Sequence, residues 1–66
     1  MNIIINGKTE KLENVRTIED IVAHYDLLAK PIVVEADGVV LTREQWASTD
    51  VREESRVELV HFVGGG

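Results

Sequence analysis

The sequence contains no cysteine. This absence excludes disulfide bonds, thiolate metal sites, a cysteine nucleophile and thioester chemistry on the chain's own side chains. Any reactive sulfur with which this protein works must therefore be supplied by another molecule.

Aromatic residues are also scarce, at 5% of the chain. The apolar fraction is nevertheless 44%, because Ile, Val and Leu dominate it, and such a composition is typical of a folded protein. We expect a single domain over residues 1–66 with a thin core, since a domain of roughly 60 residues buries only about 60% of its unfolded surface.

Positive charge and long apolar runs are in short supply. Seven Lys and Arg residues stand against twelve Asp and Glu residues, which gives a net charge of −5. Such a charge repels nucleic-acid phosphates and anionic lipid and favours a partner with a basic face. The apolar run in residues 1–6 is too short for a signal peptide or a membrane span. We expect a cytoplasmic protein that binds neither nucleic acid nor membrane.

The first half of the sequence predicts a β-hairpin and then a helix. Residues 2–6 are rich in β-branched side chains, Asn6-Gly7 suits a type I′ turn, and residues 8–12 alternate as an edge strand does. Thr17 is placed as the N-cap of a helix that should end by about Leu28, because Pro31 follows closely. One apolar stripe along this helix comprises Ile18, Ile21, Val22 and Tyr25.

The second half predicts another hairpin, a short helical turn and a final strand. Residues 32–36 and 39–41 are expected to be strands joined by the tight turn Asp37-Gly38. Thr42 and Gln45 have the spacing of a capping box, so one helical turn should carry Trp46 into the edge of the core. Residues 56–63 form the longest strand pattern of this half, and three glycines follow.

This order of elements predicts an α+β fold. Pairing the first strand parallel to the last places both in the middle of a mixed sheet of four to five strands, and the main helix then covers one face. That arrangement is the β-grasp, or ubiquitin-like, roll.

We find no catalytic or metal-binding constellation in the sequence. His24 and His61 have no carboxylate at ligand spacing, so we predict no metal site; His24 should be solvated, and His61 should line a partner surface. No apolar surrounding is indicated for the acidic pairs, and the Ser and Thr residues have no base in a recognisable motif. We therefore expect a protein that is not an enzyme, has no catalytic residues and binds no cofactor itself.

The glycine tail, Gly64–Gly66, is the informative feature. A backbone without Cβ atoms can thread where a side chain would clash, and residues 63–66 reach roughly 13 Å when extended. The plain alternative is a frayed terminus or a cloning remnant. The position directly after a predicted core strand favours a functional tail, whose terminal carboxylate an ATP-using partner can convert to an acyl-adenylate that accepts sulfur. The product is a thiocarboxylate.

The sequence resembles the ThiS family, the sulfur carriers of thiamin (thiazole) biosynthesis, over essentially its whole length. The motifs that carry the resemblance are Asn6-Gly7-Lys8, Thr17-Ile18, Asp37-Gly38, Arg43-Glu44-Gln45-Trp46 and His61-Phe62-Val63-Gly64-Gly65-Gly66. Members of the family often have proline where this chain has Thr42, a departure that leaves the tail untouched.

The resemblance implies that an E1-like, ThiF-type enzyme uses ATP to adenylate Gly66. It further implies that a cysteine desulfurase system supplies the sulfur and that a ThiG-type thiazole synthase receives it, with Gly64 and Gly65 threading the partner's active site. Two alternatives stay open: a MoaD-like carrier for molybdopterin synthesis, and a non-catalytic β-grasp interaction module whose tail has no role.

A docking surface is also predicted. If Val57 and Leu59 face the helix, the alternation of strand side chains places Val60 and Phe62 on the opposite face of the sheet. The full set of residues predicted to dock a partner is Phe62, Val60, His61, Val63, Ile4 and Val33.

Overall fold

The computed structural model describes residues 1–61, and its elements follow the predicted order. Their bounds are β1 (Asn2–Ile5), β2 (Lys8–Lys11), α1 (Ile18–His24), β3 (Ile32–Ala36), β4 (Val39–Leu41), the 3-10 helix η1 (Arg43–Ser48) and β5 (Arg56–His61). The final strand was predicted to include Phe62 and Val63, and these two residues lie outside the described residues, as does the predicted glycine tail at 64–66.

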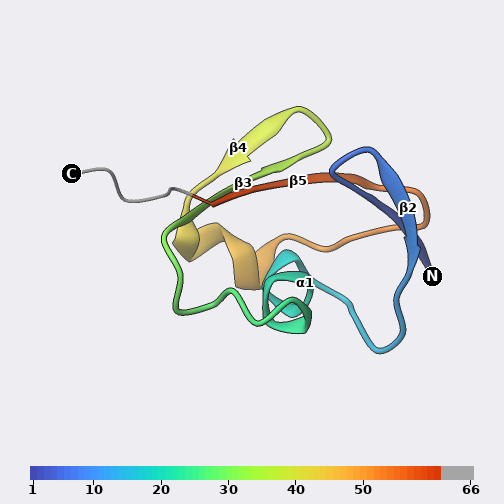
Figure 1. Cartoon of the computed structure of the whole chain (residues 1–66), viewed down its shortest axis with the longest axis horizontal. Helices are drawn as coiled ribbons and strands as arrows, with labels where there is room; N and C mark the ends of the chain where they lie inside the picture. Colours follow the sequence, from blue (N-terminus) through green and yellow to red (C-terminus); the bar gives the residue numbers. More distant parts are fainter. Residues whose placement is uncertain (62–66) are drawn as a thin grey trace.

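The five strands form one mixed sheet in the order β2-β1-β5-β3-β4 (Figure 1). β1 runs parallel to β5, with Ile4 opposite Arg56 and Ile5 opposite Val57. The other neighbouring strands are antiparallel. β1 and β5 therefore have hydrogen-bonded neighbours on both sides, and the prediction of a mixed β-grasp sheet with the first and last strands in its middle is confirmed.

Both predicted hairpin turns are confirmed by their backbone angles. Asn6 and Gly7 have φ of 49° and 82°, and Asp37 and Gly38 have φ of 49° and 86°. All four residues are thus left-handed, as a type I′ turn requires. A Cβ atom on either glycine would have no atom within 4 Å, so glycine is favoured at these two positions by its backbone freedom alone.

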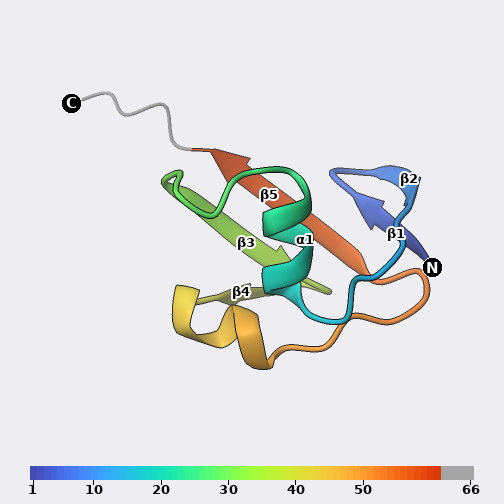
Figure 2. The same ribbon diagram turned by 90° about the horizontal axis from the view of Figure 1, so that it is seen from below.

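Helix α1 crosses one face of the sheet (Figure 2). Its start is as predicted: the Thr17 hydroxyl accepts from the N–H of Asp20 at 3.2 Å, and Asp20 Oδ2 accepts from the N–H of Thr17 at 3.0 Å. This reciprocal pair is a capping box, which satisfies two N–H groups that have no partner inside the helix.

α1 ends at His24, which lies within the predicted limit of about Leu28. Asp26 is left-handed with φ 60°, its N–H donates to the carbonyl of Ala23 at 2.9 Å, and the N–H of Leu27 donates to the carbonyl of Val22 at 3.0 Å. These two bonds form a Schellman motif. The motif ends the helix well before Pro31, and it uses Asp where glycine is the usual residue.

The 3-10 helix η1 is six residues long and thus longer than the predicted single turn. Gln45 Oε1 accepts from the N–H of Thr42 at 2.8 Å, as the capping-box spacing predicted. Arg43 lies over the Trp46 ring at 4.4 Å from its centroid and donates to the carbonyls of Leu28 and Lys30 at 2.7 and 3.0 Å. One side chain therefore fastens the segment after α1 to η1.

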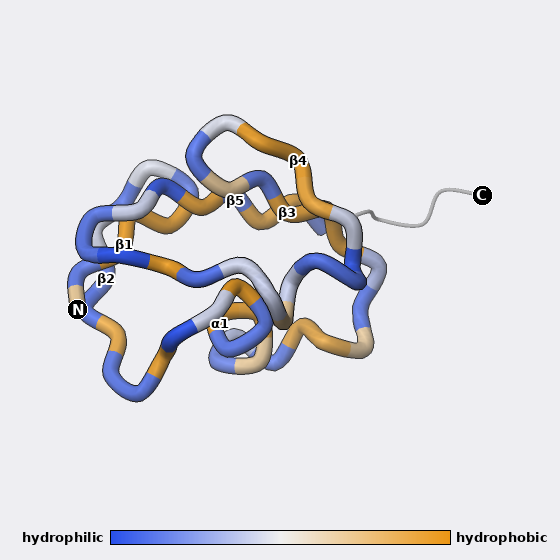
Figure 3. The backbone as a smooth tube through the Cα atoms, turned by 180° about the vertical axis from the view of Figure 1, so that it is seen from behind, coloured by the Kyte–Doolittle hydropathy of each residue, from blue (hydrophilic) through white to orange (hydrophobic). Residues whose placement is uncertain are grey.

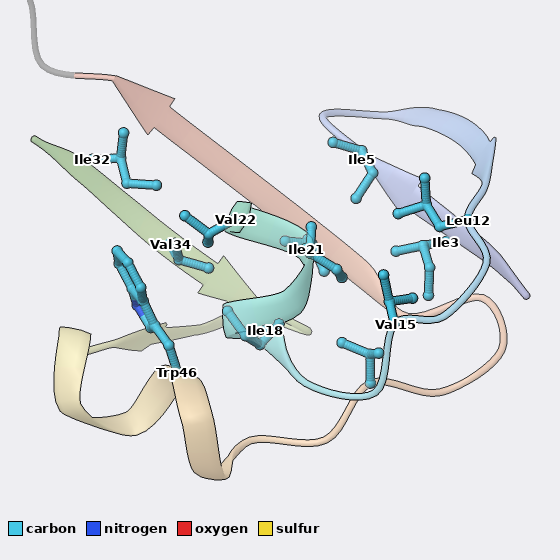
Figure 4. Close-up of a cluster of buried hydrophobic side chains, with 12 residues drawn as sticks. Ile3, Ile5, Leu12, Val15, Ile18, Ile21, Val22, Ile32, Val34 and Trp46 are labelled. Carbon is cyan, nitrogen blue, oxygen red and sulfur yellow. The ribbon is translucent and has the colours of Figure 1, made fainter. Parts of the chain in front are cut away.

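The core lies between α1 and the sheet (Figure 4). Trp46, predicted at the core edge, is only 2% exposed. Burying an Ile or Val side chain stabilises a fold by roughly 1.5–3 kcal/mol, so this small cluster supplies most of the driving force. Its members are Ile3, Ile5, Leu12, Val15, Ile18, Ile21, Val22, Ile32, Val34, Trp46, Val51 and Val57.

Candidate functional site

The described part of the candidate site is β5, the strand from which the chain continues to Gly66. β5 starts near the end of the molecule that holds the N-terminus and runs the length of the sheet to the opposite end (Figure 1). The predicted modified residue, Gly66, and the predicted threading residues, Gly64 and Gly65, lie outside residues 1–61. Their roles therefore remain predictions, and the site is built here from the strand that leads to them.

Asn6 holds β5 through its side chain as well as its backbone. Its Oδ1 accepts from the N–H of Leu59 at 2.8 Å, and its Nδ2 donates to the carbonyl of the same residue at 3.4 Å. Its backbone N–H donates to the carbonyl of Val57 at 2.9 Å. Asn6 thus extends the β1–β5 pairing beyond the end of β1.

Asp37 performs a similar task at the start of β5. Its Oδ1 accepts from the N–H of Arg56 at 2.9 Å, and its backbone N–H donates to the carbonyl of Arg56 at 2.7 Å. The sequence identified both Asn6 and Asp37 as turn residues only. Their second role went unnoticed because it depends on which strand lies beside each turn.

The faces of β5 are divided as the alternation predicted. Val57 is 1% exposed and Leu59 packs against the core, whereas Val60 is 52% exposed on the other face. His61 follows the same alternation, so it belongs to the face of Val57 and Leu59 and is exposed beyond the core.

The structure brings only some of the predicted docking residues together. Val33 and Val60 are direct cross-strand partners on the outer face of the sheet, the face that α1 leaves uncovered. Ile4 shares that face, but its partners are Thr9 and Arg56, at the opposite end of β5 from Val60. Phe62 and Val63 lie outside the described residues. Docking itself remains a prediction.

Val40 is an outer-face residue that the sequence prediction missed. It lies opposite Glu35 in the β3–β4 pair and is 62% exposed. The available signal was its position after the Asp37-Gly38 turn, because a two-residue hairpin loop fixes which residues of the two strands face each other. Counting back across the turn would have placed Val40 opposite Glu35.

The fold shifts the pKa of two side chains, Asp20 and Tyr25. The backbone N–H groups of Arg16 and Thr17 donate to Asp20 and lower the pKa of its carboxyl group. Burial, and to a smaller extent the charge of Glu10, raises the pKa of Tyr25. His24 is exposed, as predicted. Its ring lies edge-on to that of Tyr25, with 4.9 Å between the two ring centroids.

Neither a metal-binding cluster nor a membrane-spanning helix occurs in the described chain. Residues 1–61 hold no group of three or more His, Asp and Glu side chains placed to bind a metal ion. None of the helices in this range has the length and apolar character needed to span a bilayer.

Comparison with known proteins relates this chain to a described family. The ThiS family profile matches residues 3–66. The sulfur carrier protein ThiS of Bacillus subtilis is 35% identical over 63 residues, which cover 94% of this chain and 96% of that protein. Among solved structures, a crystal structure of the thiamine biosynthesis protein ThiS from Geobacter metallireducens superposes with a TM-score of 0.80 at 30% identity, with both chains fully covered.

A second kind of relative is much longer. A thiazole synthase of Magnetococcus marinus is 29% identical over 66 residues, which are all of this chain and 20% of that protein. The longer protein therefore contains a segment similar to this whole chain. Taken with the profile match and the full-length similarity to the Bacillus carrier, the chain belongs to the ThiS family of sulfur carrier proteins.

Proposed function

We propose that this chain carries sulfur in thiamin biosynthesis as a thiocarboxylate on Gly66. An E1-like, ThiF-type enzyme activates the Gly66 carboxylate with ATP, a cysteine desulfurase system supplies the sulfur, and a ThiG-type thiazole synthase receives it. The chain itself contributes no cofactor and no catalytic side chain. ATP belongs to the activating partner.

One observation carries this proposal: the family match extends through residue 66 and so includes the glycine tail. A likeness confined to the folded body would support a shared fold only. The family match includes Gly66, whose carboxylate is the proposed site of sulfur attachment. The Bacillus protein, which is named a sulfur carrier, is similar to this chain over nearly the full length of both proteins.

The proposed steps balance when a partner thiol supplies the reducing electrons. A carboxylate oxygen of Gly66 attacks the α-phosphorus of ATP, and pyrophosphate leaves. The outer sulfur of the desulfurase system's persulfide then adds to the carbonyl carbon, and the bond to the AMP oxygen breaks, which leaves an acyl disulfide and AMP. A thiol attacks the distal sulfur of this acyl disulfide, so that a disulfide forms between the partner thiols and the thiocarboxylate is released. The carrier's own contribution is to hold β5 still while its end is presented, which is the task of Asn6 and Asp37.

Thiazole synthase is supported as the acceptor by the longer relatives. Proteins of that name from Magnetococcus marinus and Paramagnetospirillum magneticum are similar to all 66 residues of this chain within 20% of their own length. Joining a carrier-like segment to a synthase keeps the two at high effective concentration. A carrier that delivers sulfur to a synthase benefits from that arrangement.

Mass spectrometry tests the proposal directly. After incubation with ATP, the activating enzyme and a sulfur donor, we expect the C-terminal peptide to gain about 16 Da, the change from oxygen to sulfur at an activated carboxyl group. A chain lacking Gly65 and Gly66 is the matched control and should show no gain. An unmodified full-length chain under conditions that modify the Bacillus carrier would contradict the proposal.

A further inference from the structure

Asn6 is the one asparagine in the sequence that is followed by glycine. The others, Asn2 and Asn14, precede β-branched residues, whose side chains crowd the backbone nitrogen to which they are attached. Glycine has no Cβ atom, so the nitrogen of Gly7 is open to a neighbouring side chain. Asparagine is a chemically labile residue, and its amide is lost most readily where the next backbone nitrogen can reach it. Asn6 therefore has the most reactive side-chain amide of the asparagines in this chain.

The turn between β1 and β2 leaves this dipeptide accessible. Asn6 and Gly7 are both exposed, so water can reach them. The N–H of Gly7 donates to no backbone carbonyl among residues 1–61, and its nitrogen is thus not held by the fold. Figure 3 shows the polar turn, in blue and white, beside β5. The reacting groups are consequently free to meet once the Asn6 side chain lets go of β5.

The Asn6 amide takes the place of a strand residue beside β5. The pairing of β1 with β5 reaches Val57, to which the backbone N–H of Asn6 donates. Further along β5, the side-chain amide supplies an acceptor at 2.8 Å from the Leu59 nitrogen and a donor at 3.4 Å from the Leu59 oxygen. Both polar atoms of the amide are therefore used, and the chemical identity of each one matters.

Loss of the amide needs water as its only co-reactant. The Gly7 nitrogen attacks Cγ of Asn6 and forms a bond to it, the Cγ–Nδ2 bond breaks, and ammonia leaves with the proton of the Gly7 N–H. The product is a cyclic succinimide, which water then opens. Attack of water at Cγ gives aspartate. Attack at the backbone carbonyl carbon gives isoaspartate, in which the chain continues through Cγ.

Both products weaken the support of Leu59. A carboxylate only accepts hydrogen bonds, so aspartate offers no donor to the Leu59 carbonyl and places a second oxygen beside it. The turn itself accommodates aspartate, because Asp37 holds the same position in the other hairpin with the same φ of 49°. Isoaspartate instead adds a backbone atom to a two-residue loop, whose length fixes the register of the hairpin.

We propose that Asn6 is a site of spontaneous deamidation, and that its amide is the group that keeps the Leu59 region of β5 bound on the β1 side. The bonds to Leu59 must open before the amide can react, so folding slows the reaction without preventing it. The proposal concerns the folded chain alone and stands whether or not Gly66 carries sulfur.

Peptide mass spectrometry of the full chain, incubated in mildly alkaline buffer, tests the site. We expect residue 6 to gain about 1 Da, the exchange of NH₂ for OH, in separately eluting aspartate and isoaspartate peptides. Asn2 and Asn14 are internal controls and should keep their amides over the same period. An Asn6 amide as persistent as these two would refute the site.

The same incubation in urea tests whether the fold holds the amide. The unfolded chain should lose the Asn6 amide at least about fivefold faster, because no bond to Leu59 has to open first. Equal rates in urea and in buffer would show that the hydrogen bonds to Leu59 do not restrain the side chain, and would overturn that part of the proposal.

Asn6→Asp tests the effect of the aspartate product on the fold. Its folding equilibrium constant, from urea unfolding, should be about fivefold below that of the wild type. The matched control is Asn14→Asp, which adds the same charge at another exposed residue with a left-handed backbone, φ 62°, and should unfold as the wild type does. Equal stability of the two variants would mean that the Asn6 amide does not hold Leu59.

Amide hydrogen exchange tests the isoaspartate product, which can be separated from the aged chain by chromatography. The Leu59 amide proton should exchange about tenfold faster in this form than in the wild type, because the displaced side chain no longer accepts from it. Unchanged protection of Leu59 would contradict the proposed release of β5.

Discussion

Trp46 has the largest fully buried side chain among residues 1–61. It stabilises η1 through its burial in the core and through its contact with Arg43. Its ring fills the space beside β3 in Figure 4, while the Arg43 guanidinium lies over it at 4.4 Å from the ring centroid. Its Nε1 is buried without a hydrogen-bond partner among residues 1–61. An unpaired buried N–H costs about 1–3 kcal/mol, which offsets part of the gain from burying the ring.

This offset predicts an unusual mutational series at position 46. Trp46→Phe should lie within about 1 kcal/mol of the wild type in urea unfolding, because the smaller ring is compensated by removal of the unpaired N–H. Trp46→Ala should lose about 3–5 kcal/mol, since nothing compensates the cavity. A Phe variant as unstable as the Ala variant would mean that the indole N–H is satisfied after all.

At the scale of elements, α1 shows how a very short helix is defined at both ends. Its seven residues are too few to be helical alone, so it depends on its caps and on the packing of Ile18, Ile21 and Val22. The first cap is electrostatic: Asp20 accepts N–H bonds from Arg16 and Thr17 at 2.8 and 3.0 Å.

The cap predicts a pH-dependent loss of stability on the acid side. These hydrogen bonds lower the pKa of Asp20, so the folded state favours the charged carboxylate. The stabilisation is complete above the ordinary carboxyl pKa of about 4 and is lost as the pH falls through the lower folded-state pKa. Asp20→Asn should therefore unfold at lower urea than the wild type at neutral pH, and the gap should close in acid.

Glu19→Gln is the matched control for this prediction. Glu19 is the neighbouring acidic residue in the first turn of α1, and it is exposed and outside the capping box. Its removal should cost less than that of Asp20 at neutral pH. Equal losses for the two variants would assign the effect to the helix dipole rather than to the cap.

The elements that sequence predicted best are those whose chemistry is local. Asn6-Gly7, Asp37-Gly38 and the Thr17 cap depend on residues within three positions of each other, and all are confirmed. The end of α1 at His24 was predicted only as a limit of about Leu28, because Asp26 takes the left-handed position without a glycine to signal it. The segment after it is held by Arg43 from η1, a contact that no local pattern reveals.

In the candidate site too, the features set by local sequence were predicted and those set by contacts between distant segments were not. Alternation correctly assigned Val57, Leu59 and Val60 to faces of β5, because a strand has a fixed period of two. It did not show that Ile4 lies at the other end of β5 from Val60, since register between parallel strands depends on the whole sheet. The positioning roles of Asn6 and Asp37 depend on the same register.

At the scale of the whole molecule, the first part of β5 is held on both sides. It pairs with β1 at Arg56 and Val57 and with β3 along its length, and the side chains of Asp37 and Asn6 bond Arg56 and Leu59. A strand held on both sides resists being pulled or shifted when its extension is bound. In the proposed function, the folded body of residues 1–61 is the part that partners recognise, and the reaction takes place on the carboxylate of Gly66.

That division predicts how the protein responds to one residue added after Gly66. An appended Leu converts the Gly66 carboxylate into an amide, so activation should stop and cells that depend on this chain for thiazole should fail to grow without thiamin. The unfolding free energy should change by less than about 0.5 kcal/mol, because the buried core side chains all belong to residues 3–57. A version in which a protease site restores Gly66 as the terminal residue should recover growth on cleavage. Growth supported by the extended chain, with mass spectrometry showing the added Leu still in place, would overturn the carboxylate mechanism.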